Sequence, residues 1–338
     1  MNRVLLRALC VGLLTALAAI PAARAQHAQT VTIVIGSEPG GGYDAYGRLA
    51  ARHLGRFLPG EPAVVPRNMP GAAGVTETNW LYNQAPRDGT AIGITQNGNP
   101  YEELFGNKNA HFDPRKFNYI MSLNRFVDLA LVRSDTPFMT AKDAFDKQII
   151  VGGIQNSDPG IMPELCNLLA GTKFKIINGY NSTTEIFLAI DRGEVQGLVG
   201  IAYDSLKATK PDWITEHKAR ILMQVGLERH PELPDIPTVM EFIKTPEDRA
   251  AAELILMRLS ASRPFVAPPG VPAPVVKELR DAFAKMAKDP DFLADAKKIH
   301  AEVAVTTGDE MAAILDKAYK TPKPIIQRAA ETLKKAGG

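Results

Sequence analysis

A glycine cluster near the start of the chain has the residue types and the spacing to bind a small anion. It lies in the segment 36–44, directly after the β-branched apolar run Val31–Ile35. An amphipathic helical pattern begins at Asp44, so free backbone N–H groups would face a ligand just beyond the end of a strand. The pattern therefore predicts binding of a carboxylate or a phosphate.

Two other interpretations of this loop stay open. Gly40-Gly-Gly-Tyr-Asp-Ala45 also fits the G-x-G-x-x-A pattern of a dinucleotide fold, and the glycines could form a purely structural turn. The second predicted strand ends at Arg67, however, where a dinucleotide-binding protein needs an acidic residue for the ribose. Asp44 stands where a helix N-cap belongs, so we expect its carboxylate to accept from the N–H of Tyr46 or Gly47, with ligand contact as the alternative. We favour anion binding and expect no bound cofactor.

The sequence contains no residues with the spacing of a catalytic or metal site. The six histidines do not stand at metal-ligand spacing from one another or from Cys166, and no serine occurs in a G-x-S-x-G motif. Cys166 lies in an apolar helical pattern and is expected to pack in a core. We therefore expect no metal and no catalytic residue, and a protein that is not an enzyme.

The first 25 residues have the pattern of a cleavable secretory signal. Arg3 and Arg7 precede an apolar run at 9–20, and Ala23-Arg-Ala25 fits a cleavage site after Ala25; a retained anchor is the alternative. The chain has 39 Lys and Arg against 37 Asp and Glu, and loss of Arg3, Arg7 and Arg24 leaves a net charge of −1. We expect a periplasmic protein without the basic excess that nucleic acid requires.

Strand-like and helix-like segments alternate along the rest of the chain, which is typical of an α/β fold with mainly parallel sheets. A strand, a polar or glycine-rich loop and a helix occur at 31–58 and again at 149–170, so we expect two similar lobes that face each other. The second loop is Gln155-Asn-Ser-Asp-Pro-Gly160, and Asn178–Thr183 is a further polar loop. The proline-rich segment 263–274 is expected to be a rigid extended connection. Strands are expected at 31–35, 63–66, 91–95, 120–123, 129–132, 149–153, 175–177, 195–200 and 220–225, and helices at 44–58, 75–83, 141–145, 183–192, 249–257, 275–286, 291–299, 308–318 and 324–335, with a further helix from 162.

Five segments in this order together resemble the solute receptors of tripartite tricarboxylate transporters, the Bug-type periplasmic proteins. The matches extend over about residues 31–285. Departures from the family pattern are Ser37 in place of an aromatic residue, one extra residue before Asn68, the absence of the family's aromatic residue in 86–90, and Asn178-Gly-Tyr-Asn181 in place of a proline-tyrosine-lysine-glycine segment. The five segments are Gly36-Ser-Glu-Pro-Gly-Gly-Gly-Tyr-Asp44, Val65-Pro-Arg-Asn-Met-Pro-Gly-Ala-Ala-Gly74, Pro86-Arg-Asp-Gly-Thr90, Leu233-Pro-Asp-Ile-Pro-Thr-Val-Met-Glu241 and Ala267-Pro-Pro-Gly-Val-Pro272.

The resemblance implies a type II periplasmic-binding-protein fold, in which two Rossmann-like α/β lobes are joined by two crossing strands and hold a ligand between them. Residues 28–124 and 226–338 would form the first lobe and 125–225 the second, with crossings near 122–128 and 223–227. The residues that the resemblance implies as ligand contacts come from loops of both lobes. They are Ser37, Glu38, Gly40, Gly41, Gly42, Tyr43, Asp44, Gln96, Asn97, Gln155, Asn156, Ser157, Asp158, Tyr180, Asn181, Ala202 and Tyr203.

The function that the resemblance implies is capture of a small carboxylate by a monomer, which delivers the ligand to a membrane permease. Glu38 places a carboxylate at the lip of the anion loop, so we expect a mono- or dicarboxylate and not a tricarboxylate. Two alternatives stay open: an exported α/β enzyme that uses the loop as an oxyanion or phosphate site, and a sensory subunit that presents its ligand to a signalling kinase.

Overall fold

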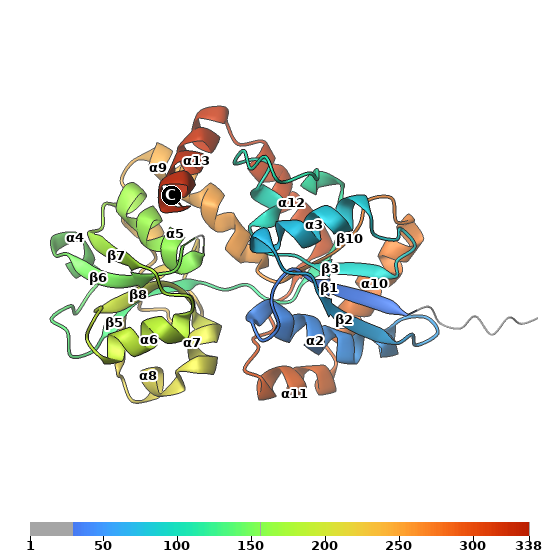
Figure 1. The fold of residues 1–338 in the computed structure, drawn as a ribbon, viewed down its shortest axis with the longest axis horizontal. Coiled ribbons are helices and arrows are strands. Elements are labelled where there is room, and N and C mark those ends of the chain that lie inside the picture. The colour runs from blue at the N-terminus through green and yellow to red at the C-terminus, as the bar shows by residue number, and fades with distance from the viewer. Residues whose placement is uncertain (1–29, 156, 338) are drawn as a thin grey trace, which may run out of the picture.

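The chain folds into two α/β lobes, each built around its own β-sheet (Figure 1). The computed structural model describes residues 30–155 and 157–337, so the expected signal peptide lies outside the described residues. In Figure 1 the lobe that begins with β1 lies on the right and the lobe that begins with β5 lies on the left. We call them the first and the second lobe.

The first lobe contains a six-stranded sheet in the order β11-β4-β10-β3-β1-β2. Strand β1 pairs in parallel with β2 and β3, whereas β10 runs antiparallel between β3 and β4. The carboxyl ends of β1 to β4 therefore meet at one edge of this sheet. The strands are β1 (Val31–Ile35), β2 (Val64–Asn68), β3 (Ala91–Ile94), β4 (Asn118–Ser122), β10 (Pro264–Ala267) and β11 (Thr306–Thr307).

The second lobe contains a five-stranded sheet in the order β7-β6-β8-β5-β9. Strand β6 pairs in parallel with β7 and β8, and β5 is antiparallel to both β8 and β9. Most strands of each sheet thus run in one direction, as expected, but both sheets are mixed, because β10 and β11 in the first and β5 in the second run the opposite way. The strands are β5 (Asp128–Arg133), β6 (Ile149–Gly153), β7 (Phe174–Asn178), β8 (Gly197–Ala202) and β9 (Ala219–Val225).

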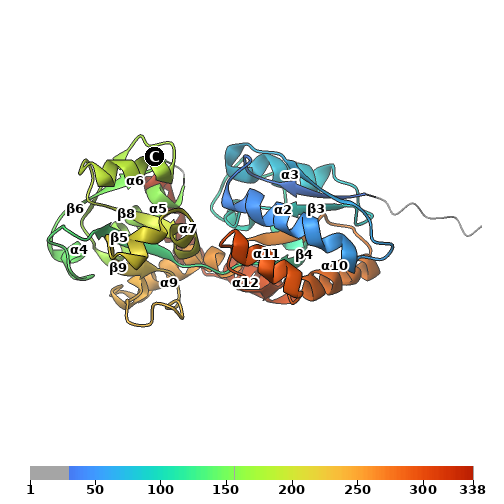
Figure 2. The same cartoon turned by 90° about the horizontal axis from the view of Figure 1, so that it is seen from below.

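Helices cover both faces of each sheet (Figure 2). In the first lobe α2, α10 and α11 pack on one face, where their apolar residues form a core with the sheet, and α3 and α12 pack on the other. In the second lobe α6, α7 and α8 pack on one face, and α5 and α9 lie on the other. The helices are α2 (Gly42–Leu54), α3 (Val75–Asn83), α4 (Asp143–Asp146), α5 (Asp158–Leu165), α6 (Thr183–Asp191), α7 (Tyr203–Thr209), α8 (Pro211–Thr215), α9 (Pro246–Leu256), α10 (Ala273–Met286), α11 (Pro290–Lys298), α12 (Gly308–Tyr319) and α13 (Lys323–Gly337).

Two crossover segments join the lobes and are hydrogen-bonded to each other. The first crossover is 123–127, between β4 and β5, and the second is 257–263, between α9 and β10. The backbone N–H of Ser262 donates to Asn124 O (2.9 Å), and that of Phe126 donates to Leu259 O (3.3 Å). The expected second crossing near 223–227 is wrong, because β9 stays in the second sheet and the chain returns to the first only at Pro264. The segment 264–267, expected to be part of an extended connection, is the central strand β10.

The C-terminal helix α13 packs on α5 and α9, beside the second sheet. Figure 1 shows it above the second lobe, although the preceding helix α12 packs on β4 of the first. The expected division gives all of 226–338 to the first lobe. From these contacts we propose that α9 and α13 belong to the second lobe, so that the chain crosses between the lobes a third time at 320–322.

Candidate functional site

The glycine loop after β1 is held in place by Asp44. The carboxylate of Asp44 accepts from the N–H of Gly40 (2.9 Å), from Nε of Arg48 (2.9 Å) and from Nδ2 of Asn68 (2.8 Å). These bonds lower the pKa of Asp44 against the opposing effect of its burial. The expected N-cap role is wrong, because the helix begins two residues earlier and Asp44 lies inside its first turn with Gly41 as N-cap. Asp44 is buried and fixes the loop, with Asn68 of β2 as the second support.

A buried arginine, Arg263, lies close to the start of α2. The guanidinium of Arg263, at the end of the second crossover, lies 4.4 Å from the ring centre of Tyr43, 5.4 Å from that of Tyr46 and 5.2 Å from that of Phe126. A Cβ on Gly42 would approach Arg263 Nη2 to 2.7 Å, so the glycine allows this close contact. The helix N-terminus and the arginine together favour a negative charge at the loop.

Tyr43 links the glycine loop to the loop after β3. Its hydroxyl accepts from the backbone N–H of Asn97 (2.8 Å), and Gln96 Nε2 donates to Gly36 O (3.3 Å). Burial raises the pKa of Tyr43, while the charges of Arg263 and Arg258 oppose the shift. The two loops that were expected to bind a ligand from the first lobe are therefore in contact with each other.

The second lobe contributes the N-terminus of α5 to the same region. Asp158, in the first turn of α5, forms an ion pair with Nη2 of Arg258 from the second crossover. Arg258 Nη1 lies 3.4 Å from the position of a Cβ on Gly98, in the loop after β3. Gly200, at a φ of +95°, has no room for a Cβ because the carbonyl of Asp158 lies 2.2 Å from that position. Arg258 therefore stands between the loops of the two lobes.

Two further buried carboxylates lie near these arginines. Asp128, the first residue of β5, is 1% exposed, and neither of its carboxylate oxygens has a hydrogen-bond partner among the described residues. Burial and the neighbouring Asp158 raise the pKa of Asp128 well above its ordinary value. Asp204 is also buried, and its Oδ2 accepts from Nδ2 of Asn124 (2.7 Å). Three acidic side chains, Asp128, Asp158 and Asp204, thus lie near the two arginines of the second crossover, and Asp158 forms an ion pair with Arg258.

Several residues that were expected to contact the ligand make their contacts elsewhere, away from Arg258 and the glycine loop. The Tyr203 ring packs edge-on against His230 (5.0 Å) with Nζ of Lys207 over its face (4.5 Å). Asn181 donates its backbone N–H to Glu185 (2.8 Å), Ala202 is buried at the end of β8, and Tyr180 packs partly on the core beside α6. Ser157 Oγ donates to Ile154 O (2.8 Å), and Gln155 is exposed; Asn156 lies outside the described residues.

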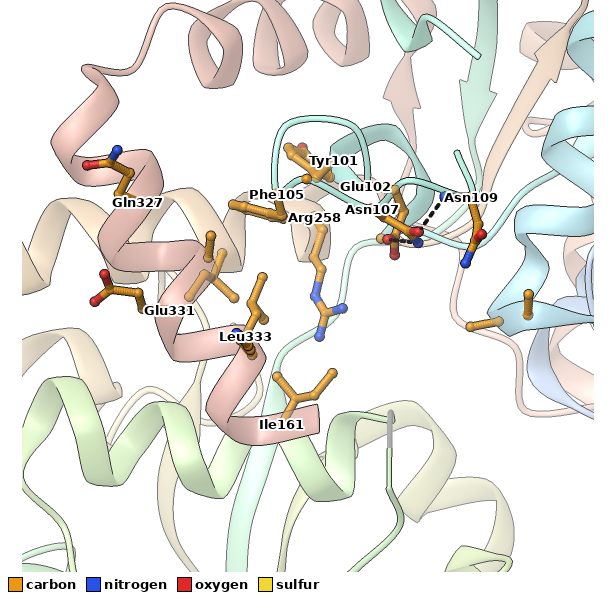
Figure 3. Close-up of a pocket in the computed structure, with 17 residues that line it drawn as sticks. Tyr101, Glu102, Phe105, Asn107, Asn109, Ile161, Arg258, Gln327, Glu331 and Leu333 are labelled. Carbon is orange, nitrogen blue, oxygen red and sulfur yellow. Dashed lines mark hydrogen bonds between the residues drawn. The ribbon is translucent and has the colours of Figure 1, made fainter. Parts of the chain in front are cut away.

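Beside the Arg258 guanidinium lies a cavity of about 1080 Å³ between the two lobes (Figure 3). Figure 3 shows Arg258 between Tyr101 and Phe105 of the first lobe and Ile161 and Leu333 of the second. Arg258 connects this cavity with the expected site, since none of the sixteen expected contacts that the structure describes lines it. The described lining residues are Ala72, Ala73, Gly98, Tyr101, Glu102, Phe105, Gly106, Asn107, Asn109, Ile161, Ile255, Arg258, Gln327, Ala330, Glu331, Leu333 and Lys334.

One wall of the cavity has an unusual backbone. Ala72 and Ala73 have φ values of 47° and 51°, between Gly71 at 132° and Gly74 at 87°. Non-glycine residues rarely adopt this left-handed region, and such strain concentrates at functional sites. A Cβ on Gly74 would come within 2.5 Å of Gln96 Cγ, so this loop packs tightly on the loop after β3.

Sequence reasoning missed Arg258, Arg263 and Asp128. Asp128 interrupts the apolar run of β5, and Arg258 interrupts the apolar run that ends α9. A lone charge inside such a run is the signal that could have indicated them, because a buried charge requires a partner or a function. Among the described residues, no group of three or more His, Cys, Asp and Glu side chains is arranged to bind a metal ion. Within the same ranges, no helix has both the length and the apolar character needed to cross a membrane.

Two lobes whose strand ends face each other, with paired crossovers and a polar site between them, define a type II solute-binding receptor. The chain belongs to the tripartite tricarboxylate transporter family of receptors, whose family model matches residues 48–330. The family is one of solute-binding receptors, which confirms both the resemblance and the expectation that the chain is not an enzyme.

Comparison with individual proteins agrees with this assignment. The UPF0065 protein in the gbd 5′ region of Cupriavidus necator is 27% identical over 312 residues, which cover 88% of this chain and 86% of that protein. A solved TctC solute-binding protein from Polaromonas has a TM-score of 0.68 at 18% identity, over 90% of this chain and 98% of that one. An R. palustris protein solved with adipate has a TM-score of 0.64 at 19% identity, over 91% and 97%. MatC from Rhodopseudomonas palustris, solved with malate, has a TM-score of 0.60 at 20% identity, over 90% and 98%. The solved structures share the fold.

Proposed function

We propose that the protein is a periplasmic receptor that binds a small carboxylate between its lobes and delivers it to the membrane permease of a tripartite transporter. The observation that carries the proposal is the convergence of three positive groups on the space between the lobes: the N-terminus of α2, Arg263 and Arg258. An anion bound there would contact the first lobe and the second crossover, beside the start of α5 in the second lobe, and would favour the arrangement that brings the lobes together.

The ligands of two proteins with the same fold support the proposal that this receptor binds a carboxylate. One was solved with adipate and the other with malate, and both are dicarboxylates. The family name supports delivery to a permease, and the pattern of residues 1–25 supports export to the periplasm. We propose that the receptor acts as a monomer, because a lobe motion about paired crossovers requires no second chain.

Calorimetric titration of the mature protein with adipate, malate, benzoate and inorganic phosphate tests the proposal. We expect at least one carboxylate to bind and to raise the melting temperature, since a ligand at 100 times its Kd stabilises the folded state by about 2.7 kcal/mol. Binding of phosphate alone, or chemical conversion of a bound carboxylate, would contradict the proposal.

Gly41→Val tests the role of the glycine loop in the same titration. Gly41 has a φ of −85°, and a Cβ there meets no atom within 4 Å, so the protein itself accepts a side chain at this position. We expect the branched side chain to block access to the backbone N–H groups and to weaken carboxylate binding about tenfold, or ~1.4 kcal/mol. Gly41→Ala should have a smaller effect, and equal affinities of all three proteins would show that the loop does not contact the ligand.

A further inference from the structure

Among the described residues, the guanidinium of Arg258 forms one ion pair, with Asp158. Its Nη2 donates to Asp158, and its Nε is buried without a hydrogen-bond partner in the described part of the chain. The planar fork of an arginine can donate two parallel bonds to one carboxylate. Because the side chain is only 14% exposed, the unpaired Nε–H donor lowers the stability of the folded protein. Arg258 can therefore gain hydrogen bonds by taking a carboxylate that approaches in the plane of its fork.

Asp158 is suited to be exchanged for such a carboxylate. Its side chain is 27% exposed, and it belongs to the second lobe, whereas Arg258 lies on the crossover and lines the cavity beside Gly98 of the first lobe. A carboxylate from a ligand would have the same charge and the same oxygen geometry as that of Asp158. Exchange would free Asp158, in the first turn of α5, to interact with the helix N-terminus, where a negative charge is favourable.

The cavity beside Arg258 indicates the shape and the charge of the rest of the ligand. Its walls carry the apolar side chains of Phe105, Ile161, Ile255 and Leu333. Its charged lining consists of two cations and two anions, so apart from Arg258 the cavity offers no net positive charge. A volume of about 1080 Å³ is large for a short dicarboxylate and at the upper end for binding pockets. The charged residues are Arg258, Lys334, Glu102 and Glu331.

We propose that Arg258 binds the ligand carboxylate in exchange for Asp158, and that the cavity accommodates the apolar body of an aromatic or long-chain monocarboxylate. This inference rests on the proposed receptor function and adds the ligand class and the anchoring residue. A tricarboxylate is disfavoured, because its second and third charges would lie near Glu102 and Glu331, and these two carboxylates outnumber Lys334, the further cation of the described lining.

Titration with phenylacetate, octanoate, citrate and the uncharged analogue phenylacetamide tests the inference. We expect the wild-type protein to bind phenylacetate or octanoate at least about tenfold more tightly than citrate. Arg258→Gln should weaken binding of the acid about thirtyfold or more and should abolish the preference for phenylacetate over phenylacetamide. Asp158→Asn should tighten binding several-fold, because it removes the internal competitor without removing the fork.

A control is available in the pair of Arg328 and Asp248, which are 2.8 Å apart, are also partly buried and do not line the cavity. Arg328→Gln and Asp248→Asn should leave the affinity for phenylacetate within about twofold.

If the wild type binds a carboxylate but Arg258→Gln binds it equally well, or if citrate or adipate binds best, the inference is wrong and the receptor function stands. If Asp158→Asn weakens binding as Arg258→Gln does, the pair has only a structural role. If no carboxylate binds the wild type, the proposed function itself is wrong.

Discussion

The side chain of Glu38 stands exposed in the glycine loop and has no ion-pair or hydrogen-bond partner among the described residues. It follows the end of β1 by three residues and precedes the exposed glycines at the start of α2. The nearby positive groups are the helix N-terminus and the buried Arg263. Glu38 therefore adds a negative charge to a loop that otherwise attracts anions, and this charge opposes ligands with several carboxylates.

Glu38→Gln is expected to tighten carboxylate binding by about twofold to fivefold at low ionic strength, because a solvent-exposed like charge costs up to ~1 kcal/mol. The gain should shrink at high salt, since screening acts strongly on exposed charges. Titrations of wild type and variant at two salt concentrations measure both effects. Glu61→Gln, at another exposed position near α2, is the control and should change nothing. A Glu38→Gln variant with weaker binding would show instead that Glu38 contacts a positive group of the ligand.

Helix α3 carries a carboxyl group into the interior of the first lobe. Glu77 is fully buried beside Gly36 and Gly93, and its Oε2 accepts from Thr78 Oγ1 (3.1 Å), whereas Oε1 has no partner among the described residues. A Cβ on Gly93 would approach Glu77 Oε1 to 2.3 Å, so the glycine in β3 makes space for this group. Burial raises the pKa of Glu77 to about 8, so the group is mostly protonated at neutral pH.

This burial predicts a dependence of stability on pH. A carboxyl group whose pKa is higher in the folded state stabilises that state most at pH values below its ordinary pKa of 4.5. This stabilisation is lost as the pH rises toward about 8. The loss between pH 5 and pH 8 is roughly 3 kcal/mol. Glu77→Gln has the same shape and no charge, so it should unfold at higher denaturant concentration than the wild type at pH 8 and at a similar one at pH 5. If the unfolding midpoints of Glu77→Gln and the wild type differed equally at both pH values, the raised pKa of Glu77 would be contradicted.

Local patterns predict most of the elements but not their partners in the sheets. The apolar period of α2 and the run of β1 are strong enough that the sequence alone locates both, with α2 beginning two residues earlier than expected. The strand β10 could not be found in this way, because it has only four residues, begins at Pro264 and is followed by Pro268, and its identity depends on pairing with β3 and β4. The short helices α7 and α8 were missed for a similar reason, since the Tyr203–Thr215 region has no apolar period of helical length.

For the candidate site too, local patterns predict the loops but not the residues whose position depends on long-range pairing. The glycine loop, the loop after β3 and the N-terminus of α5 follow strands, and sequence order alone brings them to the carboxyl edges of their sheets. Arg258 and Arg263 lie on the second crossover, which the family resemblance placed about thirty-five residues too early, at the end of β9. Their position between the lobes depends on long-range pairing of the crossovers, and no local pattern encodes such pairing.

At the scale of the whole molecule, the lobes contact each other on the side of α7 and α11 through Glu302. This residue follows α11 of the first lobe; its Oε1 lies 3.3 Å from Nε2 of His230 and its Oε2 3.8 Å from Nζ of Lys207, both in the second lobe. The hydrogen bond from His230 lowers the pKa of Glu302. The contact therefore stabilises the folded protein at pH values above the ordinary pKa of a glutamate. This stabilisation is lost as the pH falls through the lowered pKa of Glu302.

Glu302→Gln should weaken this contact between the lobes and shift the ligand-free protein toward more open arrangements. Lys207 also pairs with Glu232 of its own lobe (3.0 Å), which offers a matched control, because Glu232→Gln removes a similar charge without affecting a contact between lobes. An ion pair of this exposure contributes about 0.5–1 kcal/mol, so we expect ligand affinity to fall about twofold to fivefold in Glu302→Gln and to stay unchanged in Glu232→Gln. Small-angle X-ray scattering should give a larger radius of gyration for ligand-free Glu302→Gln only. Equal radii and equal affinities for both variants would show that the lobe arrangement depends on the crossovers and not on this contact.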